Sequence, residues 1–161
     1  MATKNTQASI AAALWLAGSV ALAQDDALER AAKEPGAVRT DSGLIYRVLK
    51  VGDGKQPNAT DRVRVHYRGT FPDGREFDSS YKRGEPAEFP LNRVIKCWTE
   101  GVQRMKVGTK AKLTCPPAIA YGERGAGGVI PPNAVLQFEV ELLAIVAPGI
   151  DPVQAPAGPR K

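Results

Sequence analysis

Apolar and polar residues alternate along four separate segments of the chain. The segments are residues 44–49, 63–68, 110–115 and 136–142, and a set of apolar side chains shares one face of each. A period of two is typical of β-strands, because successive side chains point to opposite faces of the sheet. One apolar face and one polar face indicate an antiparallel sheet that is buried on one side and meets water on the other.

A fifth stretch has helical spacing instead. Trp98, Val102 and Met105 fall at positions i, i+4 and i+7, which places them on one face of a helix over about residues 98–106. Gly108 follows as a helix-ending residue. Together the segments predict an α+β fold, a twisted antiparallel β-sheet wrapped over one short α-helix.

Turn and loop signals connect these elements. Asp73-Gly74 is a strong signal for a hairpin between two strands. Two further connections, residues 79–90 and 118–133, are long for a domain of this size, and the second is rich in glycine. Long ordered loops in small domains often carry function, so both are candidates for functional loops.

The first 23 residues have the layout of a secretory signal peptide. A weakly positive start at Lys4 leads into an apolar run that closes with the small-x-small motif Ala21-Leu22-Ala23. The apolar run has about 14 residues and a bilayer span needs about 20, which favours cleavage over the alternative of a membrane anchor. We therefore expect a mature chain that begins at Gln24, has no stable membrane insertion, and is periplasmic or secreted.

The remaining chain divides into three parts, and the middle one is the expected domain. Residues 24–40 form a short leader, which holds either a short helix over 25–33 or a flexible segment. Residues 41–147 form the predicted domain. Residues 148–161 contain four prolines and no apolar periodicity, so we expect a disordered tail.

Composition and motifs exclude several kinds of chemistry. The net charge is +5, but the basic residues are scattered and form no patch for nucleic acid. A single histidine, His66, argues against a multi-histidine metal site, and its place in an alternating segment favours a structural role. Motifs for a serine nucleophile, a zinc protease, a phosphate loop or a redox dithiol do not occur. We expect no metal, no cofactor and no nucleic-acid partner.

Five groups of residues carry a resemblance to a known family. They are VRVHYRG at 63–69, DGREFDSS at 73–80, Val94-Ile95 with WTEGV at 98–102, Ala120-Tyr121-Gly122 with IPPN at 130–133, and FEVEL at 138–142. With these motifs in this order, the chain resembles the FKBP family, the tacrolimus-binding prolyl isomerases. The resemblance covers residues 41–147.

The resemblance implies a peptidyl-prolyl cis-trans isomerase with an aromatic pocket. It assigns the catalytic positions to Tyr67, Phe77, Asp78, Trp98, Tyr121 and Phe138. It assigns the substrate-binding positions to Arg83, Phe89, Val94, Ile95, Ala120 and Ile130. In this assignment Trp98 forms the pocket floor, the Ile95 N–H and the Tyr121 hydroxyl reach substrate carbonyls, and Asp78 faces the carbonyl carbon. The implied partners are proline-containing polypeptides and macrolide inhibitors of the tacrolimus type.

The chain departs from the family pattern at three places, and one alternative function stays open. Ala87 replaces an aromatic rim residue of many members, Ala126-Gly127 replaces a bulkier loop tip, and Cys97 stands where glycine is usual. The alternative to an isomerase is a chaperone or peptide-binding module that uses the same pocket with little turnover.

Cys97 and Cys115 form a candidate disulfide. Export would place them in an oxidising compartment, where two cysteines often pair. Cys115 shares the inward strand face of Ala111 and Leu113, and Cys97 begins the helix that covers this face. The pair can thus reach the required Cα separation of about 4.4–6.8 Å. The alternative is two buried free thiols that act as small hydrophobic groups.

Overall fold

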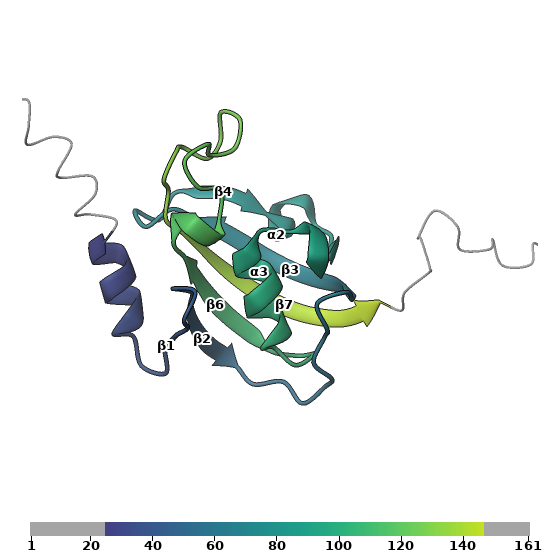
Figure 1. The fold of residues 1–161 in the computed structure, drawn as a ribbon. Coiled ribbons are helices and arrows are strands. Elements are labelled where there is room, and N and C mark those ends of the chain that lie inside the picture. The colour runs from purple at the N-terminus through teal and green to yellow at the C-terminus, as the bar shows by residue number, and fades with distance from the viewer. Residues whose placement is uncertain (1–24, 147–161) are drawn as a thin grey trace, which may run out of the picture.

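The computed structural model describes residues 25–146, so the expected signal peptide (1–23) and tail (148–161) lie outside the described residues. A helix over residues 25–32 comes first. The elements that follow are β1 (Val38–Arg39), β2 (Ile45–Lys50), β3 (Arg62–Thr70), β4 (Glu76–Ser79), α2 (Ser80–Arg83), β5 (Ala87–Pro90), η1 (Leu91–Arg93), α3 (Lys96–Gln103), β6 (Lys110–Cys115), η2 (Pro117–Ile119) and β7 (Leu136–Val146). Figure 1 shows their arrangement.

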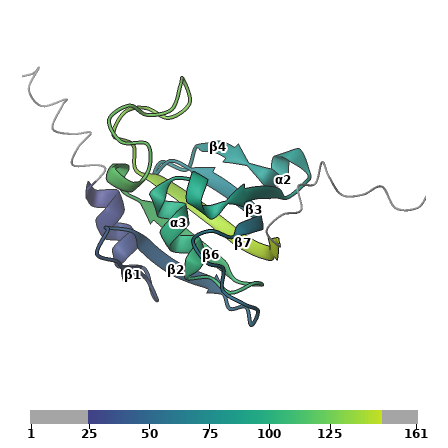
Figure 2. The same ribbon diagram turned by 45° about the vertical axis from the view of Figure 1, so that its right-hand side comes forward.

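The described strands form one antiparallel sheet in the order β1-β2-β6-β7-β3-β4, with β5 added to β3. β7 lies between β6 and β3 and pairs with both along most of its length. The sheet curves around α3, which lies across its concave side (Figures 1 and 2). The predicted α+β fold is therefore confirmed.

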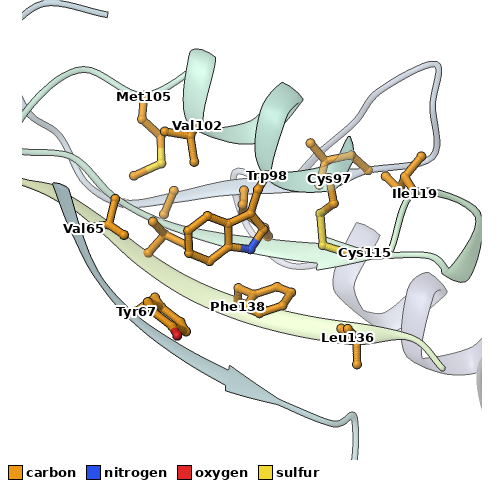
Figure 3. Close-up of a cluster of buried hydrophobic side chains, with 14 of the residues drawn as sticks. Val65, Tyr67, Cys97, Trp98, Val102, Met105, Cys115, Ile119, Leu136 and Phe138 are labelled. Atoms are coloured by element: carbon orange, nitrogen blue, oxygen red, sulfur yellow. A yellow bond between two sulfur atoms is a disulfide. The ribbon is translucent and has the colours of Figure 1, made fainter. Parts of the chain in front are cut away.

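The predicted apolar faces form the core between the sheet and α3. The inward residues of the three central strands are all buried: Val63, Val65 and Tyr67 on β3, Ala111, Leu113 and Cys115 on β6, and Leu136, Phe138, Val140 and Leu142 on β7. Trp98 and Val102 of α3 and the following Met105 pack against them (Figure 3). The opposite face carries ion pairs, among them Arg64–Glu88, Arg68–Glu76 and Lys112–Glu34.

The alternation is weakest in β2. Leu44 and Ile45 are buried, but Val48 is 42% exposed and Leu49 is 40% exposed. The ladder between β2 and β6 shifts register between Val48 and Lys50. Because a register irregularity turns the chain away from the regular pleat, the inward face of β2 is lost at this end.

The helix α3 begins and ends earlier than expected. It covers Lys96–Gln103 rather than 98–106, and Met105 lies beyond it although that side chain is fully buried. A glycine brings the helix close to the sheet: a Cβ at Gly101 would lie 2.8 Å from two side-chain carbons of Leu113. None of the described helices combines the length and the apolar character that a membrane span requires.

One of the two predicted long loops contains regular structure. Residues 79–90, expected as a loop, hold α2 and β5, and β5 pairs with the first half of β3. This strand has only four residues, ends at Pro90 and follows Pro86, so its alternation was too short to see in the sequence. The expectation of a loop there was wrong. Residues 118–133 are mostly irregular, with an isolated bridge between Ala126 and Ile130.

The segment expected as a leader is partly structured. The helix over 25–32 buries Ala27 and Ala31, which is the first of the two alternatives for this segment. Glu34 then forms ion pairs with Arg47 of β2 and Lys112 of β6. The short strand β1 adds to the edge of β2, so the sheet begins before residue 41.

Candidate active-site pocket

A pocket of about 350 Å³ opens between α3 and the concave side of the sheet. Its lining consists of Tyr67, Phe77, Asp78, Phe89, Arg93, Val94, Ile95, Trp98, Tyr121 and Phe138. The strands supply the walls, η1 and the turn after it supply one rim, and α3 supplies the floor. Tyr121 comes from the long loop between β6 and β7 and is 41% exposed.

Trp98 holds the aromatic walls in place through edge contacts. Its ring centre lies 5.2 Å from that of Tyr67, 5.5 Å from that of Phe89 and 5.4 Å from that of Phe138, all nearly perpendicular. Phe77 in turn meets Phe138 edge-on at 5.5 Å. Such T-shaped pairs are favourable because the positive edge of one ring meets the negative face of another. The result is an apolar cup with fixed walls.

Gly69 on β3 makes room for one of these walls. A Cβ at this position would lie 2.6 Å from Phe77 Cζ and 3.1 Å from Phe138 Cε1. No side chain fits at such distances without moving a ring. The glycine in the motif at 63–69 thus allows Phe77 to pack directly over the strand.

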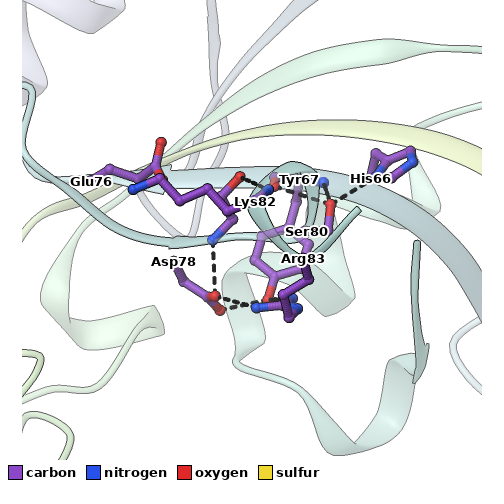
Figure 4. A network of polar contacts seen from close by, with 8 residues as sticks. His66, Tyr67, Glu76, Asp78, Ser80, Lys82 and Arg83 are labelled. Carbon is purple, nitrogen blue, oxygen red and sulfur yellow. Dashed lines mark hydrogen bonds and ion pairs between the residues drawn. The ribbon is translucent and has the colours of Figure 1, made fainter. Parts of the chain in front are cut away.

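Asp78 is held by three hydrogen-bond donors at the edge of the pocket (Figure 4). The Tyr67 hydroxyl donates to its Oδ2 at 2.5 Å, and an Arg83 guanidinium nitrogen donates to its Oδ1 at 2.7 Å. The backbone N–H of Ser79 donates to Oδ1 at 2.9 Å. Arg83 also donates to the Tyr67 hydroxyl at 2.8 Å, which closes a triangle of three side chains.

These contacts fix the charge state of the triangle. Burial raises the pKa of Asp78, but hydrogen bonds from Tyr67 and Arg83 outweigh it, so the pKa lies below its ordinary value. Burial and the hydrogen bond to Asp78 raise the pKa of Tyr67, and hydrogen bonds to Tyr67 and Asp78 raise that of Arg83. At neutral pH the site therefore contains a carboxylate, a neutral phenol and a guanidinium, and none is poised to exchange a proton.

Ser80 positions the strand that carries Tyr67. Its hydroxyl is fully buried, accepts the Tyr67 backbone N–H at 2.8 Å and lies 2.9 Å from Nδ1 of His66. The His66 ring stacks on Tyr81 at 4.6 Å between centres. Sequence reasoning did not assign this role to Ser80. His66 lies on the outer side of β3 and lines no part of the pocket, which agrees with a structural histidine.

The structure brings most of the predicted site residues together. All six predicted catalytic residues line the pocket, as do Phe89, Val94 and Ile95, while Arg83 reaches it through Asp78. Ala120 and Ile130 are not in the lining: Ala120 packs against the core, and Ile130 is 6% exposed. Ile130 exchanges two backbone hydrogen bonds with Ala126, which folds this part of the loop on itself.

Arg93 lines the pocket and was missed by the sequence analysis. It is the last residue of η1 and directly precedes Val94-Ile95. A charged residue in a short turn has no periodicity to single it out. Its position next to two predicted wall residues was the one available signal.

Two of the three departures from the family pattern lie near the site. Ala87 is half-buried and pairs with Val65 across β5 and β3. Cys97 is the second residue of α3 and is joined by a disulfide to Cys115, the last residue of β6, with a Cα–Cα distance of 5.8 Å (Figure 3). Both are fully buried, so the cross-link fixes the helix that carries Trp98 to the sheet.

Metal chemistry has no candidate centre among residues 25–146. No group of three or more His, Cys, Asp or Glu side chains is suitably placed to hold an ion there. What the pocket offers is an apolar surface, one oriented carboxylate and hydrogen-bonding groups at its rim.

Comparison with known proteins identifies the family. The family model described as FKBP-type peptidyl-prolyl cis-trans isomerase matches residues 53–143. The chain belongs to this family. That membership confirms the resemblance to the FKBP family drawn from the motifs at 63–69 and 73–80.

Individual FKBP-type relatives are similar over the same region. The chain is 61% identical over 120 residues to the FKBP-type peptidyl-prolyl cis-trans isomerase FkpA of Aeromonas hydrophila, covering 74% of this chain and 44% of that protein. It is 57% identical over 119 residues to the FKBP-type 22 kDa isomerase of Escherichia coli K12, covering 74% and 58%. The chain thus spans about half the length of these curated relatives.

A solved structure supports the FKBP fold independently. The crystal structure of a peptidyl-prolyl cis-trans isomerase from Pseudomonas syringae superposes with a TM-score of 0.75 at 34% identity. The match covers 89% of this chain and all of that one.

Proposed function

We propose that this protein accelerates the cis–trans rotation of Xaa-Pro bonds in polypeptides that fold outside the cytoplasm. The observation that carries the proposal is the aromatic pocket over Trp98, whose lining among the described residues is mostly aromatic and aliphatic and includes no serine, cysteine or histidine. Family membership supports the same activity. Rotation about an imide bond cleaves no covalent bond and only interrupts the resonance of the C–N bond, so it requires no nucleophile.

The physical basis is differential binding of the twisted imide. The cis and trans forms differ by about 0.5–1 kcal/mol, but the barrier between them is about 18–20 kcal/mol because rotation removes the amide resonance. Water stabilises the planar, more polar form, and an apolar pocket removes this preference. About 5–6 kcal/mol of selective stabilisation gives roughly a 10⁴-fold acceleration.

The pocket residues divide this work between them. The rings of Trp98, Phe138 and Tyr67 enclose the proline, and the backbone of Ile95 and the hydroxyl of Tyr121 hold the adjacent carbonyls. The Asp78 carboxylate faces the imide carbonyl as it rotates, and Arg83 and Tyr67 keep it ionised and oriented. The roles of Ala120 and Ile130 are indirect, through the fold of the loop that carries Tyr121.

Turnover of a Leu-Pro peptide tests the proposal. We expect catalysed isomerisation that a tacrolimus-type macrolide inhibits, because the macrolide occupies the same apolar pocket. Tyr121→Phe is an informative variant, since it removes one rim hydroxyl from a partly exposed side chain and should lower kcat/KM without unfolding the protein. Peptide binding in the absence of any rate enhancement would instead indicate the peptide-binding module.

The proposed location is the periplasm or the extracellular space. The signal-peptide layout of residues 1–23 supports it, as does the pairing of Cys97 with Cys115, because disulfides persist in oxidising compartments. N-terminal sequencing of the protein from its host tests the location. A mature chain that starts at Gln24 is expected, and recovery of an intact residue 1 from the cytoplasm would reject it.

A further inference from the structure

Arg93 carries the one pocket-lining charge that has no opposite partner within the described residues. It is exposed at the end of η1 and lines the pocket beside Val94 and Ile95. Among residues 25–146, no carboxylate lies within ion-pairing distance of its guanidinium.

The other charges around the pocket do not offset Arg93. Asp78 is the only other charged residue in the lining, and Arg83 and Tyr67 already occupy its two oxygens. The loop that carries Tyr121 continues with Glu123 and Arg124, one charge of each sign. Lys96, the first residue of α3, is exposed three positions after Arg93 but is not part of the pocket lining.

We propose that Arg93 is a specificity-determining residue that favours polypeptides with an acidic side chain flanking the Xaa-Pro pair. The inference rests on the proposed isomerase function. The Xaa-Pro pair occupies the apolar cup, so the residues before and after it pass over the rim. There the guanidinium, which presents several N–H donors in one plane, binds a carboxylate of the passing chain.

The size of the effect follows from the exposure of Arg93. Ion pairs between exposed groups contribute about 0.2–1 kcal/mol, which corresponds to at most about a fivefold change in kcat/KM. At low salt we expect a two- to fivefold preference in kcat/KM for glutamate over glutamine at one flanking position. Near 1 M salt, where the screening length is about 3 Å, the preference should vanish.

A peptide series with matched variants tests the inference. Peptides with a fixed Leu-Pro pair carry Glu or Gln two positions before proline, or one or two positions after it. The Glu/Gln ratio of kcat/KM is measured for the wild type, Arg93→Gln, Arg93→Lys and the control Lys106→Gln, which removes an exposed charge outside the pocket lining. The ratio should fall to about 1 only in Arg93→Gln and should persist in Arg93→Lys.

Two results would overturn the inference. One is a wild-type ratio near 1 at all three positions, and the other is an equal decrease in Arg93→Gln and Lys106→Gln, which would reflect net charge alone. Dissociation constants of the same peptides give the Glu/Gln ratio of binding affinities, which does not depend on turnover. A preserved binding ratio with no catalysis would therefore reject the proposed isomerase activity and leave the role of Arg93 standing.

Discussion

The carboxylate of Asp78 accepts hydrogen bonds from Tyr67, Arg83 and the Ser79 amide. We expect Asp78→Ala to lower the free energy of unfolding by about 1 kcal/mol more than Asp78→Asn, because asparagine keeps an acceptor oxygen. The value lies below the range of about 1.5–3 kcal/mol for hydrogen bonds to charged groups because Asp78 and Arg83 are partly exposed. Urea unfolding of both variants checks the order. Equal stabilities would show that Asp78 is solvated and unpaired.

The lowered pKa of Asp78 in the folded protein leads us to predict that stability depends on pH. Burial raises the pKa of Asp78, but hydrogen bonds from Tyr67 and Arg83 lower it by more. The pKa in the folded protein is therefore below the unfolded value of about 3.9. A group with a depressed folded pKa stabilises the protein above its unfolded pKa, and this contribution is lost as pH falls through the folded pKa. The stability difference between wild type and Asp78→Asn should thus be constant from about pH 7 to 5 and shrink below about pH 4. A difference that grows on acidification contradicts this.

The close approach of Phe77 to Gly69 leads us to predict that a side chain at position 69 disturbs the packing of the pocket wall. In Gly69→Ala, the new Cβ would lie 2.6 Å from Phe77 Cζ, so the ring must move away from Phe138. We expect a loss of about 1–3 kcal/mol in the free energy of unfolding together with a lower kcat/KM. Gly127→Ala is the matched control, because a Cβ there meets nothing within 4 Å. If both variants behave alike, the close approach of Phe77 is not a constraint.

Among the elements, α3 depends on its cross-link to β6. The disulfide between Cys97 and Cys115 closes a loop of 18 positions, which predicts a stabilisation of about 3 kcal/mol from the reduced entropy of the unfolded chain. Reduction, or the double variant Cys97→Ser and Cys115→Ser, should lower the melting temperature. Because Trp98 follows Cys97 in α3, peptide affinity should fall as well. Two alkylatable thiols in unreduced protein purified from its host would rule out the cross-link.

The strands and the helix also show how much of the fold could be predicted from the sequence. Strands β3, β6 and β7 were predictable because each buries one whole face for six or more residues. β5 was not, since four residues bounded by proline contain no usable period. The C-terminal end of α3 was predicted too late because Met105 is buried outside the helix, and burial alone does not distinguish a helical turn from the segment that follows it.

Residues of the candidate site could be predicted where they belong to the family motifs, and the others could not. The aromatic residues and Asp78 stand at fixed spacings that the family resemblance could assign one by one. Ser80 acts through a buried hydrogen bond to the Tyr67 backbone, and Arg93 through its position on a rim. The role of Ser80 depends on how separate segments meet, which no local pattern of residues expresses, and the one local signal for Arg93 was its position beside Val94 and Ile95.

For the whole molecule, a pocket that acts through its binding surface leads to a prediction about inhibitors. Isomerase activity should be unchanged by EDTA and by serine-directed reagents, because binding surfaces rather than a metal or a nucleophile lower the barrier. A peptide assay before and after each treatment measures this. Activity that EDTA abolishes and added metal restores would contradict the mechanism.

The strand order has a consequence for the time course of folding. β7 pairs with both β3 and β6, and its partners in β3 lie more than 65 positions earlier in the chain. Folding rates fall as contacts become more distant in sequence, because long loops must close before any pairing stabilises them. Until residues 136–146 have been synthesised, β3 and β6 have no strand to join them. A nascent chain of this protein therefore has β3 and β6 unjoined, and accessible to other proteins, until β7, the last described element, has emerged.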